Sequence, residues 1–132
     1  ETARMNGNIE VVPLALHNES ATLDFTEDII ASRIQTQHND EKGRFIKVEA
    51  VSLDDFVFKN NIKKVDFIKS DIEGNERNML LGATEVLKTF APKLSICTYH
   101  LFDDKEVLSQ IILSANPKYK IIQRKMKLYA YV

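Results

Sequence analysis

The chain has 132 residues, of which 44% are hydrophobic and 28% are charged, a composition typical of one globular domain. Its formal net charge of -1 gives no general attraction to nucleic acid or to an anionic membrane surface. No apolar run approaches the ~20 residues of a membrane span, and no secretion leader opens the chain, so we expect a cytoplasmic protein. The single cysteine, Cys97, excludes an internal disulfide and lies in an apolar run typical of a buried strand.

The first third of the chain is predicted to consist of strands and loops. An apolar run predicts a strand over residues 9–16, and a short second strand follows over residues 21–25. The polar residues 26–43 show little periodicity and predict a long surface loop with one helical turn. Alternation returns over residues 45–51, which predicts a half-buried strand.

The middle of the chain has a regular strand and helix pattern. Ser52 is the expected N-cap of a short helix that ends near residues 60–61, and a strand is predicted over residues 65–71. After Gly74, apolar residues repeat at helical spacing through Phe90, which predicts one long amphipathic helix.

The last third continues this alternation. A strand is predicted over residues 94–99, and Asp103 with Glu106 is expected to cap a helix that Pro117 ends. Residues 119–124 and 127–132 then form an antiparallel hairpin, because the connection between them is very short. This order predicts an α/β fold with right-handed crossovers and a mostly parallel sheet.

The four glycines are too scattered to form a phosphate-binding loop: Gly7, Gly43, Gly74 and Gly82. The main loop for any nucleotide-like cofactor must therefore lie outside this sequence, and we expect the chain to be part of a larger domain.

Three carboxylates follow the strand over residues 65–71, where an α/β sheet places its ligands. Asp71, Glu73 and Glu76 could together supply a general base, hold a divalent metal or bind a cationic ligand. Glu73 and Glu76 would also suit the first turn of the following helix, and for Glu76 we favour this structural role. Asp71, at the strand end, is the better functional candidate.

His100 follows the next strand along the chain. If the two strands are adjacent and parallel, His100 and Asp71 face the same crevice and form an acid/base pair. We interpret His17 and His38 as exposed loop residues, and Lys69 as an ion-pair partner at the end of the sheet.

These residues resemble the K-x-D-x-E-G-x-E…L-x-G-A signature of the FkbM-type methyltransferase family, over residues 65–76 and 81–83. Residues 52–55 resemble the family's T/S-L-D-D segment, residues 92–100 its P-x-L…Y-H strand and residues 128–130 its closing L-Y-A strand. Residues 11–16 resemble the family's third strand, so the resemblance covers the whole chain.

The resemblance implies an S-adenosylmethionine-dependent enzyme that methylates a hydroxyl of a sugar, a polyketide or another small molecule. It also implies a Rossmann-like, mostly parallel sheet with helices on its faces and a terminal antiparallel hairpin, a partial class I methyltransferase fold. The family's glycine-containing cofactor loop, D-x-G-A-x-x-G, does not occur in this sequence. We therefore interpret residues 1–132 as the carboxyl-terminal portion of a methyltransferase domain, inactive alone.

The resemblance also implies roles for individual residues. Asp71 would lie near the methyl-transfer centre, with His100 as the base for the acceptor hydroxyl. Glu73 would position the acceptor or link to a metal, and Ser70 and Asp71 would contact the cofactor. No residue is assigned as a resident metal ligand.

Two other functions stay open at this point. Asp71, Glu73 and Glu76 could form the magnesium site of a phosphohydrolase or nuclease, although no second acidic cluster or basic surface supports it. Alternatively, the chain is a degenerate, non-catalytic module acting in assembly, because an incomplete sheet exposes an edge and an apolar face that favour a homo-oligomer.

Overall fold

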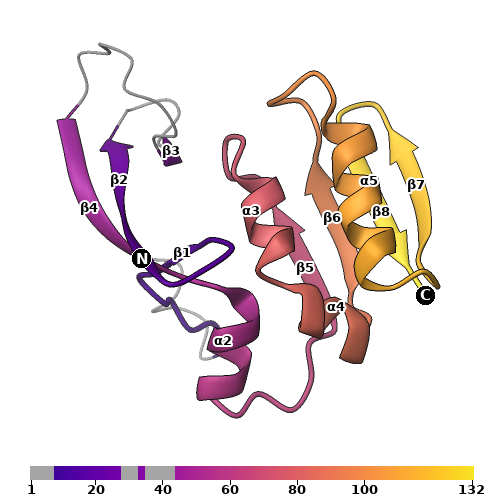
Figure 1. Ribbon diagram of the computed structural model, residues 1–132, viewed down its shortest axis with the longest axis horizontal. Helices are drawn as coiled ribbons and strands as arrows, with labels where there is room; N and C mark the ends of the chain where they lie inside the picture. Colours follow the sequence, from indigo (N-terminus) through magenta and orange to yellow (C-terminus); the bar gives the residue numbers. More distant parts are fainter. Residues whose placement is uncertain (1–7, 28–32, 35–43) are drawn as a thin grey trace.

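The computed structural model describes residues 8–27, 33–34 and 44–132, and its elements form two separate four-stranded sheets (Figure 1). The first sheet contains β1 (Ala15–Leu16), β2 (Ala21–Glu27), β3 (Arg33–Ile34) and β4 (Arg44–Val51), in the order β1-β4-β2-β3. β1 pairs with β4 in parallel, and the other pairings are antiparallel. Strand β3 falls where a loop is predicted, and His38 lies outside the described residues.

The second sheet contains β5 (Phe67–Ser70), β6 (Lys93–Cys97), β7 (Lys120–Arg124) and β8 (Lys127–Tyr131), in the order β5-β6-β8-β7. β5 and β6 are parallel, whereas β8 runs antiparallel to both β6 and β7. The α/β class and the terminal hairpin are therefore confirmed, but the prediction of a mostly parallel sheet is wrong for the described strands. The physical reason is that the tight β7–β8 turn reverses the chain, and it is the reversed strand that pairs with β6.

Helices cover one face of the second sheet. α3 (Glu76–Leu81) and α5 (Asp104–Ala115) lie side by side over it, with α4 (Thr84–Thr89) at the end of α3 (Figure 1). Residues of the strands alternate accordingly: Leu128 and Ala130 of β8 are buried, while Tyr129 and Tyr131 are exposed. The expectation of helices on the faces of the sheet is thus met on one face by the described helices.

The hydrophobic core lies between these helices and the sheet. Its fully buried side chains come from α3, α4, α5, β6 and β8 and include Leu80, Leu87, Leu108, Ile96 and Leu128. Complete burial of each such side chain contributes roughly 1.5–3 kcal/mol to stability. The core therefore fixes β5 and β6, which present the candidate site.

Helix α2 (Leu53–Lys59) begins as its sequence predicts. The Ser52 hydroxyl accepts a hydrogen bond from the Asp55 backbone N–H at 3.0 Å, which confirms the N-cap. The Asp54 carboxylate reaches further and accepts from the backbone N–H groups of Glu85 and Val86, at 3.0 and 2.9 Å. One short acidic segment thus starts α2 and also caps α4.

The predicted long helix after Gly74 is in fact two helices, α3 and α4, separated at Gly82 and Ala83. The chain passes so close to Gly82 that an added Cβ would lie 2.1 Å from the His17 backbone oxygen. This approach ends α3 and holds the segment after β1 against the helix. His17 is consequently half-buried, so its interpretation as an exposed loop residue is wrong.

Two further expectations need correction. Only Ala15–Leu16 of the predicted strand over residues 9–16 forms a strand, since Pro13 has no N–H for pairing and Val11 is 70% exposed. The cap of α5 also differs, because Asp103 makes no capping hydrogen bond and pairs instead with Arg77 at 2.5 Å. None of the described helices combines the length and the apolar character that crossing a membrane requires.

Candidate active site

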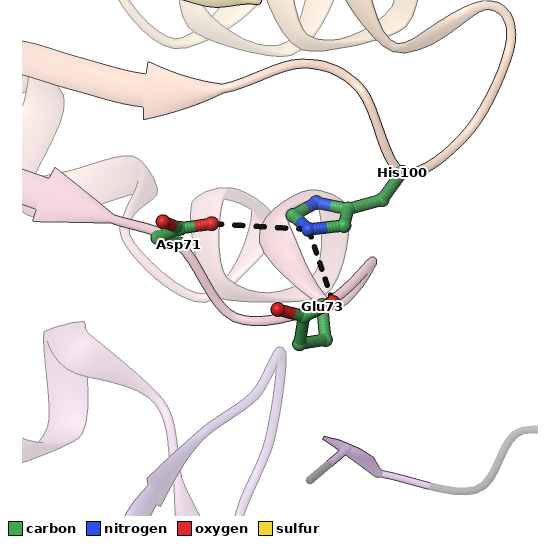
Figure 2. A group of neighbouring side chains, drawn as sticks. All are labelled: Asp71, Glu73 and His100. Atoms are coloured by element: carbon green, nitrogen blue, oxygen red, sulfur yellow. Dashed lines mark ion pairs between the residues drawn. The ribbon is translucent and has the colours of Figure 1, made fainter. Parts of the chain in front are cut away.

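The candidate site lies at the carboxyl ends of β5 and β6. These strands are parallel neighbours, with Ser70 opposite Ile96, so the segments that follow them meet at one edge of the sheet. Asp71, Glu73 and His100 point toward one another there (Figure 2). His100 Nε2 lies 3.8 Å from Asp71 Oδ1 and 3.3 Å from Glu73 Oε2. The structure thus brings together the three residues that the sequence analysis selected for catalysis.

The turn between β5 and α3 places Glu73 under the histidine. Glu73 has φ 55° and Gly74 has φ 97°, both in the left-handed region. For Glu73 this conformation costs roughly 1–2 kcal/mol, a strain typical of functional turns. The Gly74 backbone also passes close to the histidine, since a Cβ there would contact His100 Cβ at 3.7 Å. Glu73 therefore lies in the turn before α3, so the alternative that placed it in the first helical turn does not hold.

Glu76 holds both the turn and the imidazole ring. Its side chain is only 1% exposed, and its carboxylate accepts hydrogen bonds from the backbone N–H groups of Ile72 and Gly74, at 2.8 and 3.0 Å. Glu76 Oε1 also lies 3.3 Å from His100 Nδ1. Glu76 does lie in the first turn of α3, as predicted, but its bonds show that it positions the site as well.

Asp71 has two further partners. The Tyr99 hydroxyl donates a hydrogen bond to Asp71 Oδ1 at 2.9 Å, and Lys69 Nζ lies 3.8 Å from Oδ2, which confirms the predicted ion pair. The Tyr99 hydrogen bond is the main cause that lowers the pKa of Asp71, and the same bond raises the pKa of Tyr99 to about 12. Asp71 is therefore an anion at neutral pH. Tyr99 is not among the residues predicted from the sequence, where its only signal is its place beside His100.

Replacement of Tyr99 by phenylalanine is expected to raise the pKa of Asp71, because the hydrogen bond that favours the carboxylate is removed. A carboxyl-carbon NMR titration measures the change directly. The stability that Asp71 contributes is present above its unfolded-state pKa and is lost as pH falls through the lower folded-state pKa. In Tyr99→Phe the contribution of Asp71 to stability should be smaller, and its loss should be complete at a higher pH, because the folded-state pKa lies closer to the unfolded one. An unaltered Asp71 titration would contradict the assignment.

A cavity of about 360 Å³ adjoins the carboxylates. Its polar wall comes from Lys69, Ser70, Asp71, Glu73 and Asn75, while its other lining residues are apolar and include Leu16, Ile68 and Met79. Ser70 is 4% exposed, and its hydroxyl has no hydrogen-bond partner in the described part of the chain. Ser70 therefore offers a free hydroxyl at the wall of a mainly apolar space.

Cys97 is a buried thiol, as predicted. It is 1% exposed, and burial is the main cause that raises its pKa. A thiol with a raised pKa is a poor nucleophile. Cys97 is therefore not a candidate nucleophile of the site.

These features define an α/β domain whose site consists of acids and a histidine at the ends of two parallel strands. The family described as "Methyltransferase FkbM domain" matches residues 3–131, so the chain belongs to the FkbM methyltransferase domain family.

A solved structure agrees with this assignment. The chain is similar to the crystal structure of Methyltransferase FkbM from Methylobacillus flagellatus KT, with 26% sequence identity and a TM-score of 0.69. The match covers 95% of this chain and 29% of the crystallised chain, so this chain spans less than a third of that relative. No curated protein matches the chain.

Proposed function

We propose that this chain supplies the acceptor-side half of an S-adenosylmethionine-dependent methyltransferase that acts on a hydroxyl of a sugar, a polyketide or another small molecule. Two observations support the proposal: membership of the FkbM methyltransferase domain family and the contact of His100 with two carboxylates. The single observation that carries the mechanism is the orientation of the His100 imidazole, whose Nε2 points toward Asp71 and Glu73 (Figure 2).

His100 acts as the base. Glu76 beside Nδ1 favours the tautomer with the proton on Nδ1, which leaves the Nε2 lone pair to accept the proton of the acceptor hydroxyl. With its proton passed to Nε2, the acceptor oxygen would be free to take the methyl group, and the carbon–sulfur bond of the cofactor would break to leave a neutral thioether. The charge that develops on the ring is stabilised by Asp71 and Glu73, at 3.8 and 3.3 Å.

The cavity residues fit part of the cofactor. When bound, S-adenosylmethionine supplies a methyl group on a positively charged sulfur. Asp71 provides a complementary negative charge at the cavity wall, and the unpartnered Ser70 hydroxyl can bond a polar atom there. The described lining of the cavity contains no glycine-rich loop. We therefore propose that residues outside this sequence complete the cofactor site and that the chain alone is inactive.

Calorimetric titration of S-adenosylhomocysteine tests the proposal. The titration is made with the 132-residue chain and, in parallel, with the longest protein that the gene encodes. We expect binding to the longer protein only. Binding to the short chain would contradict the need for a further segment. Binding to neither protein would contradict methyl transfer and favour a degenerate module that acts in assembly.

A further inference from the structure

His100 has a buried side chain whose hydrogen-bonding capacity the described residues leave unused. It is 8% exposed, and neither of its ring nitrogens has a hydrogen-bond partner in the part of the chain that the structure describes. Its Nε2 nevertheless faces the carboxylates of Asp71 and Glu73 (Figure 2). A lone pair that faces two anions is stabilised when a positive species binds between them, and that species is either a proton taken from an acceptor hydroxyl or a metal cation.

We propose that Asp71, Glu73 and His100 form a binding site for a first-row divalent cation, with Zn²⁺ as the preferred ion. Each residue offers one ligand atom, and the three atoms lie within 4.8 Å of one another. The proposal does not rest on methyl transfer, because it follows from these three side chains alone.

The distances suit a metal ion with small adjustments. Zn²⁺ lies about 2.0–2.2 Å from nitrogen and oxygen ligands, so tetrahedral ligand atoms are about 3.4 Å apart. His100 Nε2 is 3.3 Å from Glu73 Oε2, which already matches, and 3.8 Å from Asp71 Oδ1. All three ligand atoms lie within 4.8 Å of one another, so side-chain rotations of the two carboxylates would bring the set to the ion. Three protein ligands leave one coordination position open, as in catalytic rather than structural zinc sites.

The surroundings of the site support a cation and indicate its class. Glu76 Oε1 lies 3.3 Å from His100 Nδ1, so a carboxylate stands beside the second ring nitrogen, where the group that orients most metal-binding histidines is found. Glu76 is itself fixed by two backbone N–H groups. An imidazole ligand favours Zn²⁺ and its neighbours over Mg²⁺, which prefers oxygen ligands. This preference distinguishes the site from the magnesium site considered from the sequence.

The cation and the proposed base compete for one atom. His100 Nε2 cannot hold a metal and accept a proton at the same time, so a bound cation should slow the proposed methyl transfer. Binding is measured without turnover, so the two proposals fail separately.

The test is calorimetric titration of the metal-free protein with Zn²⁺ and, separately, with Mg²⁺. We expect one Zn²⁺ per chain at this site and much weaker binding of Mg²⁺. Glu73→Gln and His100→Ala should each weaken Zn²⁺ binding by at least about 10-fold, since removing even an outer partner of a metal ligand costs 10–100-fold. Glu76→Gln, which removes that outer partner, should weaken it by about 10–100-fold.

Asp66→Asn is the matched control, since Asp66 is an exposed carboxylate that pairs with Lys64 outside the cluster. It should bind Zn²⁺ as the unchanged protein does. Glu73→Gln guards against misfolding as an explanation, because the Glu73 side chain is 35% exposed and glutamine has the same shape. Absence of Zn²⁺ binding, or Zn²⁺ binding that Glu73→Gln leaves unchanged, would overturn the proposal.

Discussion

Replacement of His100 by alanine lowers the kcat of the longest encoded protein by about 10²–10⁴-fold, the usual contribution of a general base. The His100 side chain is 8% exposed, and its Nε2 faces Asp71 and Glu73. Its removal therefore takes the proposed base out of the site. Folding should change little, because Glu76 keeps its two backbone hydrogen bonds when the imidazole is removed. The loss should therefore appear in turnover and not in the melting temperature.

Steady-state turnover with a panel of sugar and polyketide alcohols measures this effect, with circular dichroism as the check on folding. Asp71→Ala is measured beside His100→Ala, because Asp71 stabilises the charged ring in the proposed mechanism. Asp66→Asn serves as the control with a carboxylate removed at the surface, and it should retain full activity. Normal turnover in both His100→Ala and Asp71→Ala would show that the site assignment is wrong.

The place of Asp71 and His100 could be predicted because it depends on local information. Each residue follows an apolar strand, and an amphipathic helical segment lies between the two strands. Consecutive strands joined in this way are usually adjacent and parallel, so their carboxyl ends meet. The register of Ser70 opposite Ile96 confirms this step. One edge of the sheet could thus be located from the sequence, even though the sheet as a whole could not.

The direction of the remaining strands could not be predicted from the same pattern. Strand β8 has the alternating residues of any half-buried strand, with Leu128 and Ala130 directed inward. Alternation shows which face of a strand is buried, but it does not show which neighbour the strand pairs with. In the structure β8 pairs with β6, and this non-local choice makes the sheet mixed.

The side-chain hydrogen bonds of the site could not be predicted from the sequence either. Glu76 could be placed in the first turn of a helix, but its burial depends on backbone N–H groups of the preceding turn. Tyr99 is exposed at the strand end, and its bond to Asp71 depends on how two loops meet. Such contacts form between segments that sequence periodicity treats separately.

The break between α3 and α4 at Gly82 could not be predicted from helical periodicity for the same reason, since it depends on a distant segment. Apolar residues continue at helical spacing from Met79 through Leu87 because α3 and α4 pack against one core, so the periodicity shows no interruption. The cause of the break is the backbone of His17, which is distant in sequence.

Replacement of Gly82 by alanine should destabilise the protein by about 3 kcal/mol or more, at the upper end of the cost of overpacking. The new Cβ would lie 2.1 Å from the His17 backbone oxygen, and backbone cannot rotate away as a side chain can. The segment after β1 would have to move. Asn75 donates a hydrogen bond to the Leu16 carbonyl at 2.8 Å, so this movement would also disturb the start of α3 beside the candidate site.

Urea unfolding measures the change, and the sign of the effect identifies its cause. Gly82 has φ -81°, an ordinary conformation, so without the close approach alanine would stabilise the protein by about 0.4–1 kcal/mol. Gly74→Ala is the contrasting control, since Gly74 has φ 97° and its added Cβ would meet only ordinary contacts. That variant should lose about 1–3 kcal/mol through backbone strain alone. A Gly82→Ala protein as stable as the original would show that the His17 segment does not pack against α3, because nothing else at Gly82 requires glycine.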